Sequence, residues 1–198
     1  MAKTEAAICY LLAKASPNPI SKTSLIKLCY FADLESVRRW GVPITGEAYQ
    51  RDRYGAVAYS IPNSARNVPG VDVMDYPTYT GNHGTDFCAG PGMPDPEYDL
   101  RISEKVVLDD VFFQHGKQLA KDLGNATKQT EPWLKAEAEG ATDLDLSVVA
   151  PRDRGAYVEQ VLSRIDRSSR GTPEQIAERN SEVEEFMRPY RVSATCER

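Results

Sequence analysis

The chain has 198 residues, of which 41% are hydrophobic and 27% charged, and its formal net charge is −5. These values are ordinary for a globular protein, so they exclude a wholly disordered chain, and no apolar run approaches the roughly 18 residues of a membrane-spanning helix. The length suits one domain with an appendage. The start, "MAKTEAAICYLLAK", has no small-residue cleavage site of a signal peptide, so we expect a cytoplasmic protein without a membrane partner.

Apolar residues at helical spacing predict two helices at the start of the chain, over about residues 4–15 and from Ser21 to Trp40. The prolines of "ASPNPIS" separate them, and Ser21 is a suitable N-cap for the second. Gly41 and Pro43 follow as helix-ending residues. The second helix is apolar on two neighbouring faces, which is typical of a central, buried helix.

Asp33 interrupts the apolar pattern of this helix, in the stretch "KLCYFADLE". A buried carboxylate must be hydrogen-bonded or paired, since burying it alone costs several kcal/mol or more. We predict that it binds backbone N–H groups, Tyr54 or Arg53 and so ties the helix to the segment after it. Its loss would cost on the order of 1–3 kcal/mol of stability.

The middle of the chain is less regular. Residues 44–57 fit short strands or a hairpin, with Ala48-Tyr49 and Arg53-Tyr54 as strand pairs. Residues 67–99 hold five prolines and five glycines, which predicts a loop insertion or a small hairpin of "VDVMDY" against "DFCAG". Helical patterns return over about 103–115, in "QLAKDLGNATKQTEPWLKAEAEG", and over about 151–168 and 172–187. The fold class predicted is α+β, mainly α: a compact helical domain with a small β-hairpin or sheet and a C-terminal helical extension.

Residues that carry chemistry are few and scattered. The four cysteines form no C-x-x-C pair, and the two histidines, His83 and His115, lie in different segments. We therefore expect no metal site, no disulfide and no cofactor. Neither a nucleophile motif nor a phosphate-binding loop occurs, so we predict that the protein is not an enzyme. A catalytic site assembled from residues distant in the sequence stays open.

A helix–turn–helix start followed by a hairpin is also compatible with a winged-helix DNA-binding protein. Lys22, Lys27, Arg38 and Arg39 supply basic residues on the second helix. However, the centre of that helix reads "LCYFADL", and an apolar helix is a poor reader of a major groove. The acidic middle of the chain argues against nucleic acid as well. DNA binding is therefore kept only as an alternative.

Residues 25–57, "LIKLCYFADLESVRRWGVPITGEAYQRDRYGAV", resemble the Panacea domain, also called the SocA-like antitoxin domain. That family shows a Leu-rich helix with a Tyr-x-Ala-Asp type signature, a Gly-x-Pro-Ile/Leu-Thr-Gly turn and a Tyr-Gly-Pro-Val corner. The resemblance extends over about residues 4–135, although Ala56 stands where the family usually has proline. The matching positions are Tyr30, Asp33, Gly41, Pro43, Gly46, Tyr54, Gly55 and Trp133.

The resemblance implies a Panacea domain over residues 1–135, with 67–99 as an insertion, and a helical extension over 136–198. It also implies an antitoxin of a toxin–antitoxin pair, often carried by phages or mobile elements, that neutralises a cognate protein toxin by direct binding. Two alternatives are an adaptor that delivers the toxin to the ClpXP protease and the DNA-binding regulator. Whether the chain forms a homo-oligomer stays open.

We expect toxin contacts in the segments that look like elaborations of the family, because an interface needs aromatic or arginine side chains at its centre. These segments are the Pro/Gly-rich insertion and the C-terminal helices. An alternative is that their large side chains pack on their own domain. The candidate contact residues are Tyr76, Tyr79, Phe87, Phe186, Arg188, Tyr190 and Arg191.

Overall fold

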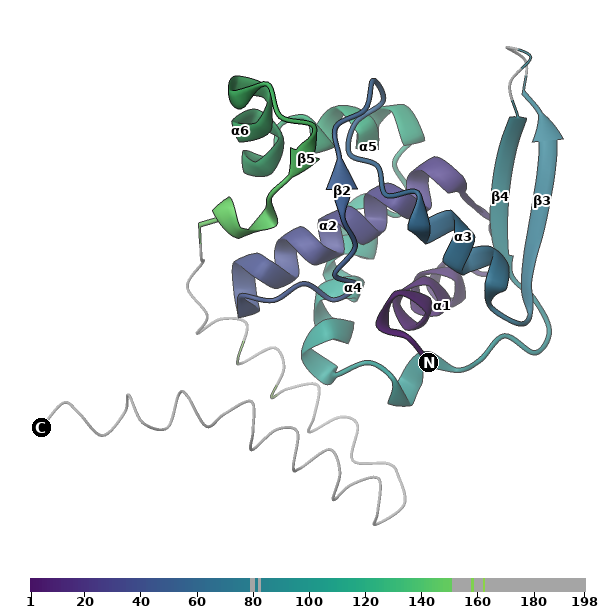
Figure 1. Ribbon diagram of the computed structural model, residues 1–198. Helices are drawn as coiled ribbons and strands as arrows, with labels where there is room; N and C mark the ends of the chain where they lie inside the picture. Colours follow the sequence, from purple (N-terminus) through teal and green to yellow (C-terminus); the bar gives the residue numbers. More distant parts are fainter. Residues whose placement is uncertain (79–80, 82, 151–157, 159–161, 163–198) are drawn as a thin grey trace, which may run out of the picture. The chain divides into compact units, whose positions relative to one another are not determined.

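The computed structural model describes residues 1–78, 81, 83–150, 158 and 162. The chain divides into a unit Met1–Tyr157 and a unit Val158–Arg198, and every helix and strand with described bounds lies in the first. This first unit is mainly helical with small antiparallel sheets, which confirms the predicted fold class (Figure 1). Its elements are α1 (Lys3–Ala15), β1 (Ile20–Ser21), α2 (Lys22–Trp40), β2 (Tyr49–Gln50), α3 (Ser60–Asn67), β3 (Val71–Pro77), β4 (His83–Ala89), η1 (Pro96–Tyr98), α4 (Ile102–His115), α5 (Ala120–Thr127), α6 (Glu131–Glu139), β5 (Asp143–Leu144) and η2 (Leu146–Val148).

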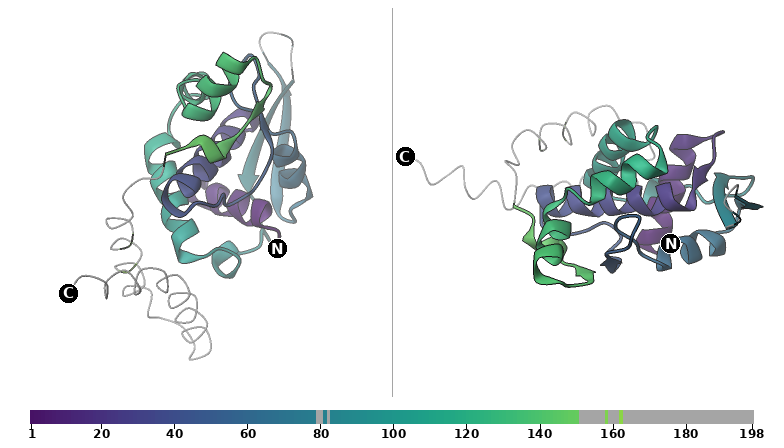
Figure 2. Two further views of the ribbon diagram at one scale, coloured as in Figure 1. Left: turned by 60° about the vertical axis from the view of Figure 1, so that its left-hand side comes forward. Right: turned by 90° about the horizontal axis from the view of Figure 1, so that it is seen from above.

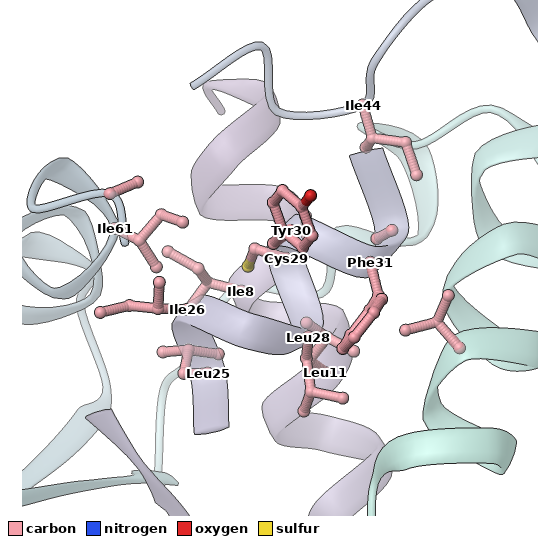
Figure 3. Packing of buried hydrophobic residues seen from close by; sticks show 14 of the residues in the cluster. Ile8, Leu11, Leu25, Ile26, Leu28, Cys29, Tyr30, Phe31, Ile44 and Ile61 are labelled. Carbon is pink, nitrogen blue, oxygen red and sulfur yellow. The ribbon is translucent and has the colours of Figure 1, made fainter. Parts of the chain in front are cut away.

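Helix α2 is the centre of this unit and contacts α1, α3, α4 and α5. The Ser21 side chain caps its start by accepting a hydrogen bond from Ser24 N at 3.1 Å. Gly41 ends it in the left-handed conformation, with φ +81°, where glycine carries no steric penalty. Apolar side chains of α2 pack against α1 and α3, as Figure 3 shows for Leu25, Ile26, Leu28, Cys29, Tyr30 and Phe31 with Ile8, Leu11 and Ile61.

The Pro/Gly-rich segment 67–99 contains an antiparallel hairpin, so the hairpin interpretation is confirmed. Strands β3 and β4 pair from Val71↔Ala89 to Pro77↔His83, and β1 adds a third strand beside β4. Phe87 lies opposite both Ile20 and Val73 and is completely buried. The hairpin lies toward the N-terminal end of α2 and the α6–β5 segment toward its C-terminal end (Figures 1 and 2).

Residues 44–57 form strand structure with a distant partner. Strand β2 pairs with β5, and a single bridge joins Gln50 to Val57. The predicted Ala48-Tyr49 strand is therefore present in part, whereas Arg53 and Tyr54 lie in a turn and the strand predicted there is wrong. The unit continues through β5 and η2, and the division predicted after residue 135 stays a prediction. The helix predicted over 172–187 lies outside the described residues, as does nearly all of the one over 151–168.

Candidate partner-binding site

The carboxylate of Asp33 joins α2 to the turn directly after it. Its Oδ1 accepts hydrogen bonds from the backbone N–H groups of Ile44 at 2.8 Å and Thr45 at 2.7 Å. Its Oδ2 accepts from the Thr45 hydroxyl and from Tyr49 OH, the latter at 3.0 Å. We call these groups the Asp33 junction. The predicted backbone partners are found, but Arg53 and Tyr54 are not among the partners, because the junction forms directly after Pro43.

Asp33 is fully buried, and this burial raises the pKa of its carboxyl above the usual value while the four hydrogen bonds oppose the shift. The neighbouring Tyr49 is buried as well, and desolvation raises its phenol pKa. Every oxygen of Asp33 is occupied by protein donors. The geometry is that of a structural connection, since a carboxylate enclosed in this way has no room for a substrate.

A second connection holds the sharp bend at Gly55, which we call the Gly55 corner. Gly55 has φ +95°, and a Cβ at this position would lie 2.6 Å from the carbonyl oxygen of Gly124 in α5. The next residue, Ala56, donates its N–H to Thr127 Oγ1 at 3.1 Å and accepts a hydrogen bond from Lys27 Nζ. The corner is thereby fixed to both α2 and α5.

Lys27 is a buried cation of α2, with 1% of its surface exposed. Burial lowers the pKa of its amine from 10.5 to about 8, with Lys128 lowering it further and Asp52 raising it. A buried ammonium has three N–H donors, and the Ala56 carbonyl takes one. The sequence offered Lys27 as one of the basic residues available to the DNA-binding alternative. Its place between Leu25 and Leu28, on the apolar side of the helix, was the signal that it is buried.

Above Lys27 lies a surface cavity of about 470 Å³, which we call the α3 pocket. The first turns of α2, the segment from Asp52 to Tyr59, α3 and β4 supply its walls. Its polar and aromatic lining includes Lys22, Lys27, Asp52, Tyr54, Tyr59 and Arg66. Tyr54 and Tyr59 are 65% and 66% exposed, which makes them the most exposed tyrosines among the described residues. This pocket was not anticipated, because its walls come from four separate elements.

The family model described as "Antitoxin SocA-like, Panacea domain" matches residues 25–134. The chain belongs to this family. The match covers α2 from Leu25 onward, the Asp33 junction, the Gly55 corner and the start of α6. Comparisons with curated proteins and with solved structures gave no match. Among the described residues, no helix has the length and apolar character to cross a membrane.

The residues that carry the Panacea resemblance are mostly structural in position. Tyr30 is completely buried, its OH lies 2.6 Å from Thr130 Oγ1, and burial raises its pKa to about 12. Pro43 and Gly46 flank the two residues whose N–H groups bind Asp33. Trp133 is buried against Arg51, whose guanidinium carbon lies 5.2 Å from the ring centre. Tyr54 differs from all of these, since its side chain is exposed at the pocket.

The departure at Ala56 from the Panacea corner has a structural counterpart. The Ala56 N–H donates to Thr127 Oγ1, and proline has no N–H to donate. Thr127 in turn donates to Gly124 O at 2.8 Å, so the whole corner is hydrogen-bonded to α5. Alanine at this position therefore adds a bond that the usual proline could not form.

The predicted toxin contacts divide into three groups. Tyr76 is 41% exposed on β3, and its OH donates to Asp86 Oδ1 at 3.0 Å, so it stays a candidate contact. Phe87 is wrong as a contact, because its side chain points into the core from the inner face of the sheet and has no exposed area. The remaining candidates lie outside the described residues: Tyr79, Phe186, Arg188, Tyr190 and Arg191.

The histidines and cysteines that the structure describes are the next candidates for metal binding or reactivity. No cluster of three or more His, Cys, Asp or Glu side chains suited to a metal ion occurs among them. His115 stacks on Phe31 with ring centres 4.3 Å apart, while His83 lies at the start of β4. Cys9 and Cys29 are buried free thiols whose pKa values are raised, chiefly by desolvation. These thiols are therefore held in the unreactive, protonated form.

Proposed function

We propose that this protein is the antitoxin of a toxin–antitoxin pair and that it neutralises a cognate protein toxin by binding it directly. The observation that carries the proposal is the match of residues 25–134 to the SocA-like antitoxin Panacea domain. The described surface supports it with exposed tyrosines around a pocket, since tyrosine is enriched at the centres of protein interfaces. The role is one of binding rather than catalysis.

The structure argues against α2 as a DNA recognition helix. Thirteen of its residues are buried, including Lys27, Arg38 and Arg39. Arg38 pairs with Glu131 at 2.7 Å and Arg39 with Asp110 at 2.7 Å, so both guanidinium groups are already neutralised within the unit. A recognition helix must present its side chains to base edges, which α2 at the centre of the core cannot do.

The proposal is tested by co-expressing this protein with the product of the gene beside its own. The neighbour alone should arrest growth, this protein alone should not, and the two together should restore growth and co-purify as a stable complex. Rescue in which the neighbour disappears, and reappears when the protease is deleted, would replace neutralisation by binding with delivery to a protease. Absence of both rescue and complex would overturn the proposal.

A further inference from the structure

The α3 pocket has an excess of positive charge, in a chain whose net charge is −5. Three cationic side chains line it, Lys22, Lys27 and Arg66, against one carboxylate, that of Asp52. Arg66 is engaged by Asp75, with N–O distances of 2.7 and 3.1 Å. In the part of the chain that the structure describes, neither Lys22 nor Lys27 forms an ion pair with a carboxylate. Two cations therefore stand against the single carboxylate of Asp52, which leaves the pocket with a net positive charge.

The pocket also has the apolar parts of a protein-binding site. Ile26, Val57 and Pro62 contribute apolar lining. Tyr54 and Tyr59 add aromatic rings, each about two-thirds exposed. Tyrosines beside a concave, partly apolar surface are the usual centre of an interface, because they bury much area with little loss of side-chain freedom. A small inorganic anion would leave these rings unused, whereas a peptide segment would cover them.

We propose that the α3 pocket binds an acidic segment of the cognate toxin, with a carboxylate pairing with Lys22 and Lys27 between the rings of Tyr54 and Tyr59. The inference rests on the proposed function, because it takes the toxin as the partner. The inference adds two things to the proposed function: the surface of this chain that binds the toxin, and the acidic character of the toxin segment that is bound. Charge complementarity selects the occupant, because a pocket lined by more cations than carboxylates favours an anionic segment and disfavours a basic one.

The buried amine strengthens this assignment. Lys27 is held in the core at a cost, as the lowered pKa of its amine reflects, and the Ala56 carbonyl satisfies only part of its donor capacity. A carboxylate that enters the pocket stabilises the charged amine and is excluded from bulk water by the tyrosines. A hydrogen bond between the charged amine and a carboxylate is charge-assisted, and such bonds are roughly twice as strong as bonds between neutral groups.

The test uses two exposed pocket residues, so that the core stays intact. Lys22→Glu places an acidic residue in the first turn of α2, where the helix dipole favours a negative charge. Tyr59→Ser places serine at the N-cap of α3, a position where serine is a preferred residue. The matched controls are Lys121→Glu in the first turn of α5 and Leu119→Ser at its N-cap, both exposed. Affinity of each full-length variant for the product of the neighbouring gene is measured by calorimetry.

Each pocket variant should weaken binding about 10-fold or more, the effect of losing a central contact, while each control stays within about 2-fold. Carbodiimide coupling of the wild-type complex should join Lys22 to an aspartate, a glutamate or the C-terminus of the toxin. Lys22→Arg should lose that cross-link and keep the affinity, since it retains the charge without the amine.

The outcomes separate the two proposals. Wild-type protein that neither neutralises nor binds the neighbour overturns the proposed function and, with it, the role of the pocket. Wild-type neutralisation with undiminished binding by Lys22→Glu and Tyr59→Ser overturns the pocket alone. A cross-link from Lys22 to a second copy of this chain, instead of to the toxin, also overturns it.

Discussion

The two halves of α2 bury opposite charges in different ways. Toward its C-terminal half, Asp33 accepts four hydrogen bonds from the segment after the helix and is enclosed. Toward its N-terminal half, Lys27 has the Ala56 carbonyl as its acceptor and lines a surface pocket. A buried charge whose hydrogen-bonding capacity is filled holds a fold together. A buried charge that lies beside a cavity and still has hydrogen-bond donors without acceptors is suited to bind a charged group of a partner protein.

This difference assigns stability and recognition to separate parts of one helix. The Asp33 junction joins groups eleven to sixteen residues apart in sequence, so it belongs to the local architecture of the Panacea domain. The α3 pocket joins α2 to α3 and to a strand of the hairpin. A partner can therefore be recognised at the pocket without disturbing the junction.

The largest expected effect comes from breaking the junction. Asp33→Ala leaves two backbone N–H groups, of Ile44 and Thr45, without their acceptor, and each such group costs about 1–3 kcal/mol, so the free energy of unfolding should fall by about 3–4 kcal/mol, more than the roughly 1–3 kcal/mol expected before both donors were known. The exposed carboxylate of Asp122 is the control, and Asp122→Ala should change the free energy of unfolding by at most about 1 kcal/mol. Urea unfolding measures both. Equal midpoints for the two variants would contradict the structural role of Asp33.

The buried amine of Lys27 should make the free energy of unfolding depend on pH. Because the pKa of Lys27 is about 8 in the folded chain and 10.5 is its ordinary value, the unfolded state binds more protons between these pH values. The contribution of Lys27 to stability should therefore rise from pH 8 to 10.5, by at most about 3.5 kcal/mol at roughly 1.4 kcal/mol per pKa unit, while the raised thiol pKa values of Cys9 and Cys29 act in the opposite direction in both proteins. Lys27→Met should lack this rise. Parallel stability–pH curves for the two proteins would show that Lys27 is not desolvated.

The Gly55 corner, which supplies the acceptor for Lys27, gives a smaller effect. Gly55→Ala places a methyl group 2.6 Å from the Gly124 carbonyl in addition to the strain of φ +95°. Gly81→Ala is the matched control, because its φ is +79° and no residue that the structure describes lies within 4 Å of the added Cβ. We expect Gly55→Ala to cost about 2 kcal/mol more than the control. Thermal unfolding compares them, and equal losses would show that the corner can move away from α5.

The sequence predicted the central helix and its buried carboxylate, but it did not predict the surface pocket. The two-sided apolar pattern of α2 identified it as the core helix, and Asp33 within that pattern identified a buried, hydrogen-bonded carboxylate. Its partners were placed too far along the chain, because the pattern shows that donors are needed and not which turn supplies them. The turn directly after the helix lies nearest and supplies them.

Other features depend on contacts that no local pattern encodes. Strand β2 is two residues long and pairs with β5 near the end of the described unit, so periodicity gives no signal for it. Phe87 was predicted as a toxin contact because it lies in a segment rich in glycine and proline, for which both a loop and a hairpin were open. Once the hairpin forms, strand alternation places Thr85 and Phe87 on the buried face together. The α3 pocket could not be predicted from the sequence, because it forms only where four separate segments meet in the folded chain.

The separation of recognition from stability within α2 is tested by comparing Lys22→Glu with wild-type protein in two assays, toxin affinity and thermal unfolding. We predict that affinity for the neighbouring gene product falls about 10-fold or more while the Tm stays within about 2 °C. That pair of results would separate recognition at the pocket from stability at the Asp33 junction. Unchanged affinity would contradict the account, as would a loss of affinity that accompanies a loss of folded protein.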